Sequence, residues 1–330
     1  MPQIHSRAPT GAWLAVSALS LLIVPWSLVL ASKVIEERRP ADPQGSIEIV
    51  NMAGSVEVDG WDRSEVEVTG TAGDQVERVE VTSTGTLTSI HVESRAGGGW
   101  GHDRDTKLII RVPAKSMLSA TLISADFVVH GVLGDIKAQT VSGDVSGDVG
   151  SNARISTVSG GVRLTAQQAK SIEIRTISGD IRLSGDAGDV EITTVSGEAQ
   201  IELATLTRGR FKSVSGNLSA SFALAPDGQL ESESVSGKIQ FEFAGVPAAD
   251  FDVQSFSGDI KNCFGPKPVE PQYGPGSRLT FKNGDGQGRV QAATKSGDIQ
   301  LCVKGGHARH VSFVPGAAAT VSRLEIPYVI

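Results

Sequence analysis

Several residue types are scarce in this 330-residue sequence. It contains only two cysteines, which excludes a disulfide-rich framework and is too few for a four-cysteine zinc site. Lysine and arginine total 30 against 37 acidic residues, a net charge of −7, and no basic cluster is present. Because binding to nucleic acid requires a basic surface that neutralises phosphates, we predict no nucleic-acid partner.

Aromatic residues are also few, at 5%, whereas glycine reaches 38 residues. Such a composition suits many tight turns better than a core of bulky side chains. The length would allow two ordinary domains, but it is equally compatible with one elongated repeat protein.

The N-terminus carries an apolar stretch, residues 11–31, that contains no charged residue and follows Arg7. A basic start followed by an apolar run is typical of an export signal, and the small residue Ala31 offers a cleavage site. The run is longer than most signal cores and approaches the length that spans a bilayer. Residues 1–31 are therefore either a cleaved signal peptide or an N-terminal membrane anchor. We predict export to the periplasm or cell envelope, with membrane contact only through residues 11–31 if they remain attached.

A Ser-Gly pair recurs along most of the remaining chain, usually after an apolar residue, as in Val141-Ser142-Gly143. Successive glycines are 17, 19, 18, 19, 21, 21 and 39 residues apart. Repeats of this length are typical of solenoid proteins, in which each repeat forms one coil of the stack. The glycines, which we predict to be structural corners, are Gly143, Gly160, Gly179, Gly197, Gly216, Gly237, Gly258 and Gly297.

Apolar residues alternate with polar ones on both sides of each corner. Ile181 and Leu183 lie two and four residues after Gly179, and Ile172 and Ile174 lie seven and five residues before it. Alternation with a period of two indicates half-buried strands. The predicted fold is therefore all-β: a β-solenoid of coils of about 17–21 residues, with two strands and two corners in each coil.

Three positions beside each corner glycine also repeat. Threonine or serine always lies three residues before the glycine and serine one residue before it, and we expect these hydroxyls to form ladders along the stack. The residue two before the glycine is mostly apolar, but it cannot share a face with the inward positions further upstream. We therefore expect the chain to bend there, with the glycine supplying the unusual torsions of the bend.

The repeat sets approximate boundaries along the chain. Residues 32–112 are rich in alternating strands but less regular, so we predict an irregular N-terminal β region. The regular solenoid is predicted over residues 113–305, with a proline-rich loop at residues 265–276. Residues 306–330 no longer carry the repeat and are predicted to cap the last coil.

One family shares these motifs. The stretch from Gly54 to Asp62 (GSVEVDGWD), followed by repeated Thr-Val-Ser-Gly-Asp corners, resembles the bacterial "putative adhesin" family nicknamed toast-rack, over residues 45–303. The resemblance implies an exported β-solenoid related to the head regions of autotransporter adhesins. The family supplies no established catalytic residues, so none is assigned here.

We expect a non-catalytic binding or scaffold module with an envelope or surface ligand, either glycan or protein, and with no cofactor. Two alternatives remain. Asp144, Asp180, Asp259 and Asp298 follow their corner glycines and could form a calcium-binding column, although aspartate also favours such turns without a metal. A polysaccharide-cleaving enzyme would need a carboxylate pair across a groove, and no pair is singled out by the repeat. His307 and His310 have the spacing of a metal pair but lack a third ligand.

The two cysteines occupy equivalent places, because Cys263 and Cys302 each lie five residues after a corner glycine. If their strands are neighbours, about 4.8 Å apart, a disulfide can form. The 39-residue gap could instead hold a complete coil with Leu279 and Phe281 as inward residues, which would keep the cysteines too far apart. Because the prolines at 266–275 disfavour a strand, we predict a looped-out segment and a disulfide.

Overall fold

The computed structural model describes residues 33–94, 106–270 and 275–305. This part of the chain contains twenty β-strands and no helix, so none that could span a membrane. The all-β solenoid predicted from the repeat is confirmed. The predicted signal or anchor at 1–31, the cap at 306–330 and the His307–His310 pair lie outside the described residues.

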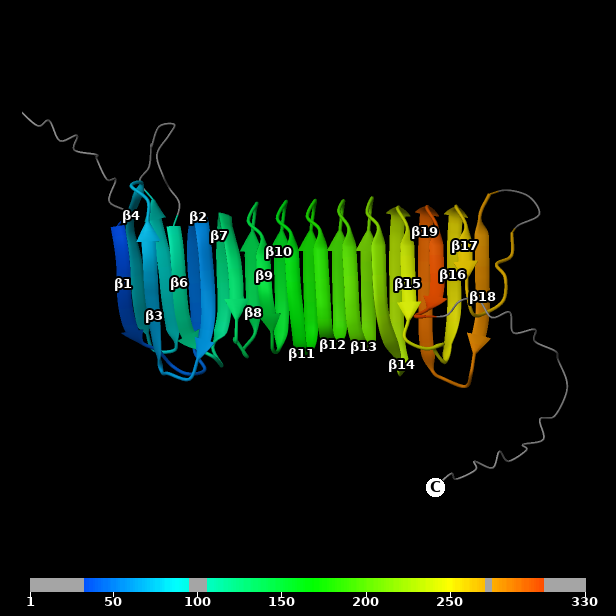
Figure 1. The fold of residues 1–330 in the computed structure, drawn as a ribbon, viewed down its shortest axis with the longest axis horizontal. Helices are drawn as coiled ribbons and strands as arrows, with labels where there is room; N and C mark the ends of the chain where they lie inside the picture. Colours follow the sequence, from blue (N-terminus) through cyan, green and yellow to red (C-terminus); the bar gives the residue numbers. More distant parts are fainter. Residues whose placement is uncertain (1–32, 95–105, 271–274, 306–330) are drawn as a thin grey trace, which may run out of the picture. The chain divides into compact units, whose positions relative to one another are not determined.

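The strands follow one another along the chain (Figure 1). The first seven are β1 (Lys33–Pro40), β2 (Ser46–Trp61), β3 (Glu65–Ala72), β4 (Val76–Thr84), β5 (Leu87–Ser94), β6 (Thr106–Pro113) and β7 (Met117–His130). The next seven are β8 (Ile136–Thr140), β9 (Val145–Val149), β10 (Asn152–Thr157), β11 (Val162–Thr176), β12 (Ile181–Thr194), β13 (Ala199–Ser213) and β14 (Leu218–Ser236). The last six are β15 (Ile239–Phe243), β16 (Ala249–Ser257), β17 (Ile260–Asn262), β18 (Ser277–Asn283), β19 (Gly288–Ser296) and β20 (Ile299–Val303).

The twenty strands belong to one continuous hydrogen-bonded sheet that bends at the corners into two layers, and each coil contributes one strand segment to each layer. We call these layers the entry sheet and the exit sheet. The entry sheet contains the segments that lead into the Ser-Gly corners, and the exit sheet contains the segments that leave them. The long strands β11 to β14 serve both sheets, because each continues through the second corner of its coil, where the pairing register shifts. The second corner is therefore a bend within a hydrogen-bonded strand.

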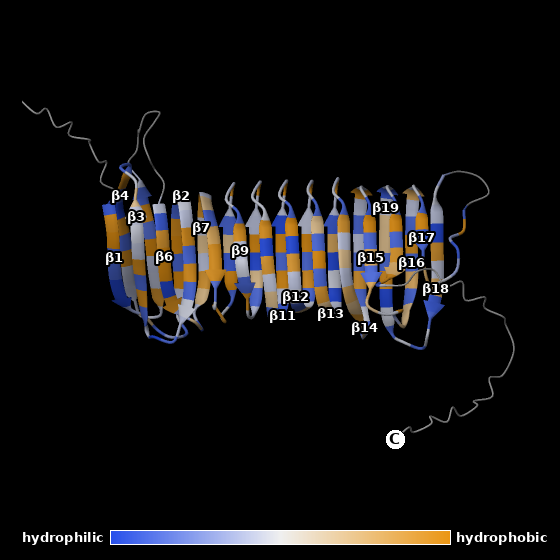
Figure 2. Cartoon of the chain, in the orientation of Figure 1, coloured by the Kyte–Doolittle hydropathy of each residue, from blue (hydrophilic) through white to orange (hydrophobic). Residues whose placement is uncertain are grey.

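Within each of the two layers the register is constant from coil to coil, so equivalent residues form columns. In the exit sheet, for example, Ile181 pairs with Val162 on one side and Ala199 on the other. Figure 2 shows the hydrophilic and hydrophobic residues alternating along β11, β12 and β13. Ile172, Ile174, Ile181 and Leu183 are all at most 1% exposed, whereas Arg182 is exposed. The core is thus a continuous column of aliphatic side chains between the sheets.

Both ends of the stack are interleaved. At the N-terminal end, β2 lies between β7 on one side and β5 and β6 on the other. At the C-terminal end, the last coil, β19–β20, lies between the β14–β15 coil and the β16–β17 coil. In sequence order, the terminal β16–β17 coil precedes the inserted β19–β20 coil, whereas at the N-terminal end the inner strand β2 precedes the outer strands β5 and β6.

Antiparallel strands flank the stack where the interleaving occurs. β1 pairs with β3, β3 with β6, β4 with β5 and β18 with β16, all antiparallel. β1 carries Lys33, Glu36, Glu37, Arg38 and Arg39, and charged edge strands of this kind discourage pairing with another chain.

Candidate functional site

The Ser-Gly corners form one long edge of the solenoid, and they are held by bonds that repeat from coil to coil. At four of the eight corners, the hydroxyl three residues before the glycine accepts a hydrogen bond from the glycine N–H of the same corner, at 2.9 Å for Thr157–Gly160 and Thr176–Gly179. Thr140 and Ser213 do the same at 3.1 and 3.0 Å. The equivalent hydroxyls of Thr194, Ser234 and Thr294 have no hydrogen-bond partner among the described residues. The expected hydroxyl ladder along the stack is wrong for this column, since a hydroxyl so close to its own corner satisfies that corner first.

The serines before the glycines lie outside the core and bond mainly to backbone. Ser159 and Ser178 donate to the Val141 and Val158 carbonyl oxygens of the preceding coil, at 3.3 and 3.2 Å. A direct hydroxyl–hydroxyl bond occurs between Ser142 and Ser124, at 3.2 Å. This column also forms no continuous ladder.

Close approach of neighbouring corners explains the glycines. A Cβ atom built on Gly160 would lie 1.9 Å from the Gly143 carbonyl oxygen, and one on Gly179 would lie 1.9 Å from the Gly160 oxygen. Neither of these two glycines has a positive φ, but Gly197, Gly237, Gly258 and Gly297 have φ angles of 136–156°, so the unusual torsion expected from the sequence is present at four of the eight corners. Any side chain would force the coils apart.

Beside the glycines runs the most distinctive surface of the molecule. The residue two before the corner glycine, or before Ala125 in the one coil where alanine takes its place, points outward and is 40–50% exposed in eight successive coils. We call this column the apolar ridge. Its members, in spatial order, are Met52, Ile123, Val141, Val158, Ile177, Val195, Val214 and Val235. Lys295 of the inserted coil interrupts the column, and Phe256 of the terminal coil, 66% exposed, resumes it.

On the exit-sheet side of the corner, aspartate and asparagine side chains tie coils together. Asp144 Oδ1 accepts a hydrogen bond from the Gly161 N–H at 2.7 Å, and Asp180 Oδ1 accepts one from the Glu198 N–H at 2.9 Å. Asn217 forms the same bond to the Lys238 N–H, although it carries no charge. These residues therefore act as links between neighbouring corners.

The calcium alternative gains no support from this column, because one oxygen of each linking carboxylate is already committed to the backbone. Among the described residues, no group of three or more histidine, cysteine, aspartate or glutamate side chains has the arrangement of a metal site.

Elsewhere, many carboxylates pair with arginines across coils. On the outward face of the entry sheet, Glu173 bonds to both Arg154 and Arg175, and Arg210 bonds to Glu231. Such ladders of opposite charges stabilise neighbouring strands. Each glutamate of these ladders is engaged by an arginine, so the ladders do not supply the free carboxylate pair that polysaccharide cleavage would require.

The N-terminal end contains the one ionisable side chain that is buried among the described residues. Glu67 on β3 is 5% exposed and lies between Arg38 of β1 and Arg111 of β6. The hydrogen bond from Arg111, 2.7 Å long, and the contact with Arg38 hold the pKa of the Glu67 carboxyl below its ordinary value. The triad joins the three outermost strands of the exit sheet.

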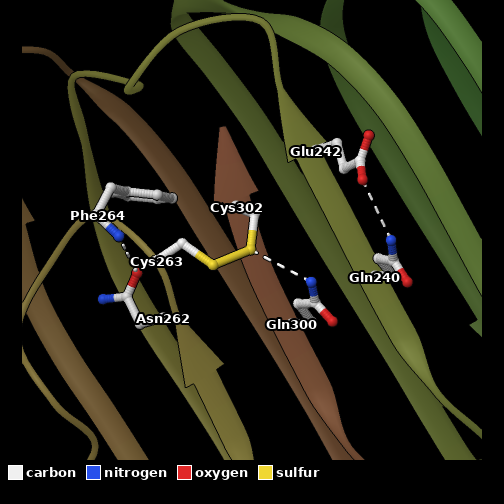
Figure 3. The surroundings of a disulfide bond; sticks show 7 residues. All are labelled: Gln240, Glu242, Asn262, Cys263, Phe264, Gln300 and Cys302. Atoms are coloured by element: carbon white, nitrogen blue, oxygen red, sulfur yellow. Dashed lines mark hydrogen bonds between the residues drawn. A yellow bond between two sulfur atoms is a disulfide. The ribbon is translucent and has the colours of Figure 1, made fainter. Parts of the chain in front are cut away.

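Cys263 and Cys302 form a disulfide, with Cα atoms 4.8 Å apart (Figure 3). Cys263 directly follows β17 and Cys302 lies within β20, and these two strands are direct neighbours. The intervening segment differs from both expectations. It is neither a simple loop nor a complete coil. Residues 277–283 form β18, which pairs with β16 in the antiparallel direction. The chain then continues into β19, which lies between β14 and β16. Within the described part of the proline-rich loop, Val269 pairs with Arg278 and covers the edge of β18.

The geometry can now be compared with known proteins. The family model described as Toastrack DUF4097 matches residues 45–302, most of the chain. The chain belongs to the toast-rack family. The resemblance seen in the sequence is thereby confirmed, and the toast-rack domain includes both the irregular N-terminal strands and the regular coils.

Solved structures similar to this toast-rack chain share little sequence with it. A "putative lipid binding protein" from Parabacteroides distasonis is 14% identical, with a TM-score of 0.47, covering 81% of this chain and 96% of that one. A "putative adhesin" from Parabacteroides merdae is 12% identical, with a TM-score of 0.44 and coverages of 82% and 96%. Similarity at this level carries no functional argument. No curated protein matches the chain.

Proposed function

We propose that this toast-rack protein is an exported, non-catalytic binding module of the bacterial cell envelope. Its contact surface is the apolar ridge, and its ligand is a protein that presents apolar side chains. Export rests on the uncharged apolar stretch at residues 11–31.

The ridge carries this proposal. Scattered apolar residues on a surface are ordinary, but a contiguous apolar patch marks an interaction site. Here eight exposed apolar residues lie in consecutive coils, about 4.8 Å apart. The core of the solenoid does not include the ridge side chains. At these corners the buried position is taken by the residue that precedes the ridge residue in the sequence, such as Thr157 and Thr176.

The character of the ridge favours a protein ligand over a glycan. Seven of its eight members, in adjacent coils from Ile123 to Val235, are valine or isoleucine, which are both β-branched. Sugar rings pack preferentially on aromatic faces, whereas aliphatic side chains pack well against other aliphatic side chains. Phe256 is the one aromatic residue among the large exposed hydrophobics of the described chain.

Purified protein incubated with isolated cell envelopes tests the function. We expect it to cosediment with envelopes and to lose that binding when envelope proteins are digested by protease beforehand. Release of glycan fragments into the supernatant would show an enzyme instead. Mass spectrometry of the mature N-terminus, combined with cell fractionation, tests the export step, and a cytoplasmic location would contradict it.

A further inference from the structure

A hollow of about 540 Å³ opens on the exit-sheet side of the corners, and no residue of the apolar ridge lines it. Its lining includes Asp144, Asp180, Arg163, Arg182, Ser159 and Gly161. Gly161 occupies the column in which neighbouring coils carry Asp144 and Asp180. A Cβ built there would meet Asp144 Oδ1 at 3.4 Å and the Asp180 carbonyl oxygen at 3.7 Å, which are ordinary contacts. The backbone therefore accepts a side chain at this position, and its absence creates the hollow.

Two arginines border the hollow side by side. Arg163 and Arg182 are direct partners on the neighbouring parallel strands β11 and β12, and both are exposed. Their neighbours in the same column, Ser146 and Gln200, are uncharged. No ion pair found in the described chain includes either guanidinium, in contrast to the paired arginines of the entry sheet. Like charges directly opposite each other destabilise a sheet, so an anion held between them would relieve a cost.

Carboxylates lie on the corner side of the same hollow. Asp144 and Asp180 each use Oδ1 to accept a backbone N–H from the next coil. They flank the Gly161 position from the two neighbouring coils, about 9.6 Å apart at the backbone, and Asp126 lies at the far rim. The hollow thus presents two cationic groups and, two residue positions away along the chain, carboxylate oxygens suited to an ammonium group.

We propose that this hollow binds a zwitterionic group consisting of a phosphate ester and a primary ammonium, as in phosphoethanolamine. The phosphate bridges Arg163 and Arg182, since its several oxygens can accept hydrogen bonds from two guanidinium groups at once. The ammonium donates to the free oxygens of Asp144 and Asp180. This small-ligand site is separate from the apolar ridge and does not depend on the function proposed for it.

Calorimetric titration of the purified protein with O-phosphoethanolamine tests the site. We expect saturable binding that falls at least tenfold in R163Q and in R182Q. D144N keeps an oxygen that can accept the Gly161 N–H but loses the charge, so it should also weaken binding. R208Q, on the outward face of the entry sheet, is the matched control and should bind as the wild type does. Inorganic phosphate and ethanolamine alone should each bind at least tenfold more weakly. Equal affinity for inorganic phosphate, or no binding by the wild type, would overturn the proposal.

Gly161→Asn separates binding from folding. Its side chain can accept the Asp180 N–H, as Asn217 accepts the Lys238 N–H, so the melting temperature should not fall, while the filled hollow should no longer bind. Unchanged binding by G161N would contradict the proposed location. Vesicles containing phosphatidylethanolamine, compared with vesicles of phosphatidylcholine alone, identify the source. Selective binding to the former indicates a lipid headgroup, and binding only to free phosphoethanolamine indicates a soluble ligand.

Discussion

At the scale of single residues, neighbouring side chains on one strand have opposite environments. Ile181 is 1% exposed and Arg182 is exposed. Ile181→Asp places an unpaired charge in the core column and should destabilise the protein by more than about 4 kcal/mol. Arg182→Asp should change stability by about 0.5 kcal/mol or less. Chemical denaturation of both variants checks this pair, and similar midpoints would contradict the observed strand parity.

The environment of Glu67 predicts how the stability of the fold depends on pH. Because its folded-state pKa is lowered by Arg111 and Arg38, ionised Glu67 favours the folded state. That contribution is complete above the ordinary value of 4.5 and is lost as the pH falls through the lower, folded-state value. Melting temperatures between neutral and acidic pH should therefore fall less steeply in Glu67→Gln than in the wild type. Parallel curves for the two proteins would show that the triad does not contribute.

At the scale of elements, the corners depend on close backbone approach. Gly179→Ala places a Cβ against the Gly160 carbonyl oxygen and should cost about 1–3 kcal/mol or more. Gly188→Ala at the second corner is the matched control, since its Cβ would meet only the Lys170 oxygen at an ordinary 3.5 Å. We expect that change to be close to neutral. Equal losses of stability in the two variants would remove close approach as the reason for the corner glycines.

The disulfide fixes the interleaved C-terminal end, because it joins the terminal strand β17 to the inserted strand β20. Closing a loop of 39 residues in the unfolded chain stabilises the folded state by about 4 kcal/mol in the chain-entropy account. The variant with both cysteines replaced by serine should therefore unfold earlier, with hydrogen exchange rising first in β16–β20. Non-reducing peptide mapping should show the Cys263–Cys302 link, and two freely alkylated thiols would contradict it.

Features of the fold that depend on neighbouring residues in the sequence could be predicted, whereas features that depend on contacts between distant segments could not. The alternation around Gly179 and its fixed spacing determine which residues face the core, so strand parity and the solenoid could be predicted. The place of the last coil could not, because the repeat at Gly297 fits equally well at the end of the stack or inside it. The hollow at Gly161 was also missed, although the missing side chain in the aspartate column was a visible signal.

At the scale of the whole molecule, constant register converts one exposed position per coil into a continuous surface. One exposed apolar residue in a single coil is ordinary, but the same exposed position in eight coils forms the apolar ridge. The neighbouring coils also support one another, since each one's backbone hydrogen bonds are made to the next. A binding surface of this kind can therefore be altered at several positions without touching the core.

The central claim is that the apolar ridge binds the envelope ligand, and the dissociation constant for isolated envelopes tests it most directly. The triple variant V158T/I177T/V195T keeps the branched shape of the side chains but removes apolar contact worth about 0.8 kcal/mol per methyl group. We predict a dissociation constant roughly tenfold to a hundredfold higher than that of the wild type. The matched control V34T/V246T/V269T changes exposed valines outside the ridge and should bind as the wild type does. Equal binding by the wild type and the ridge variant would contradict the account.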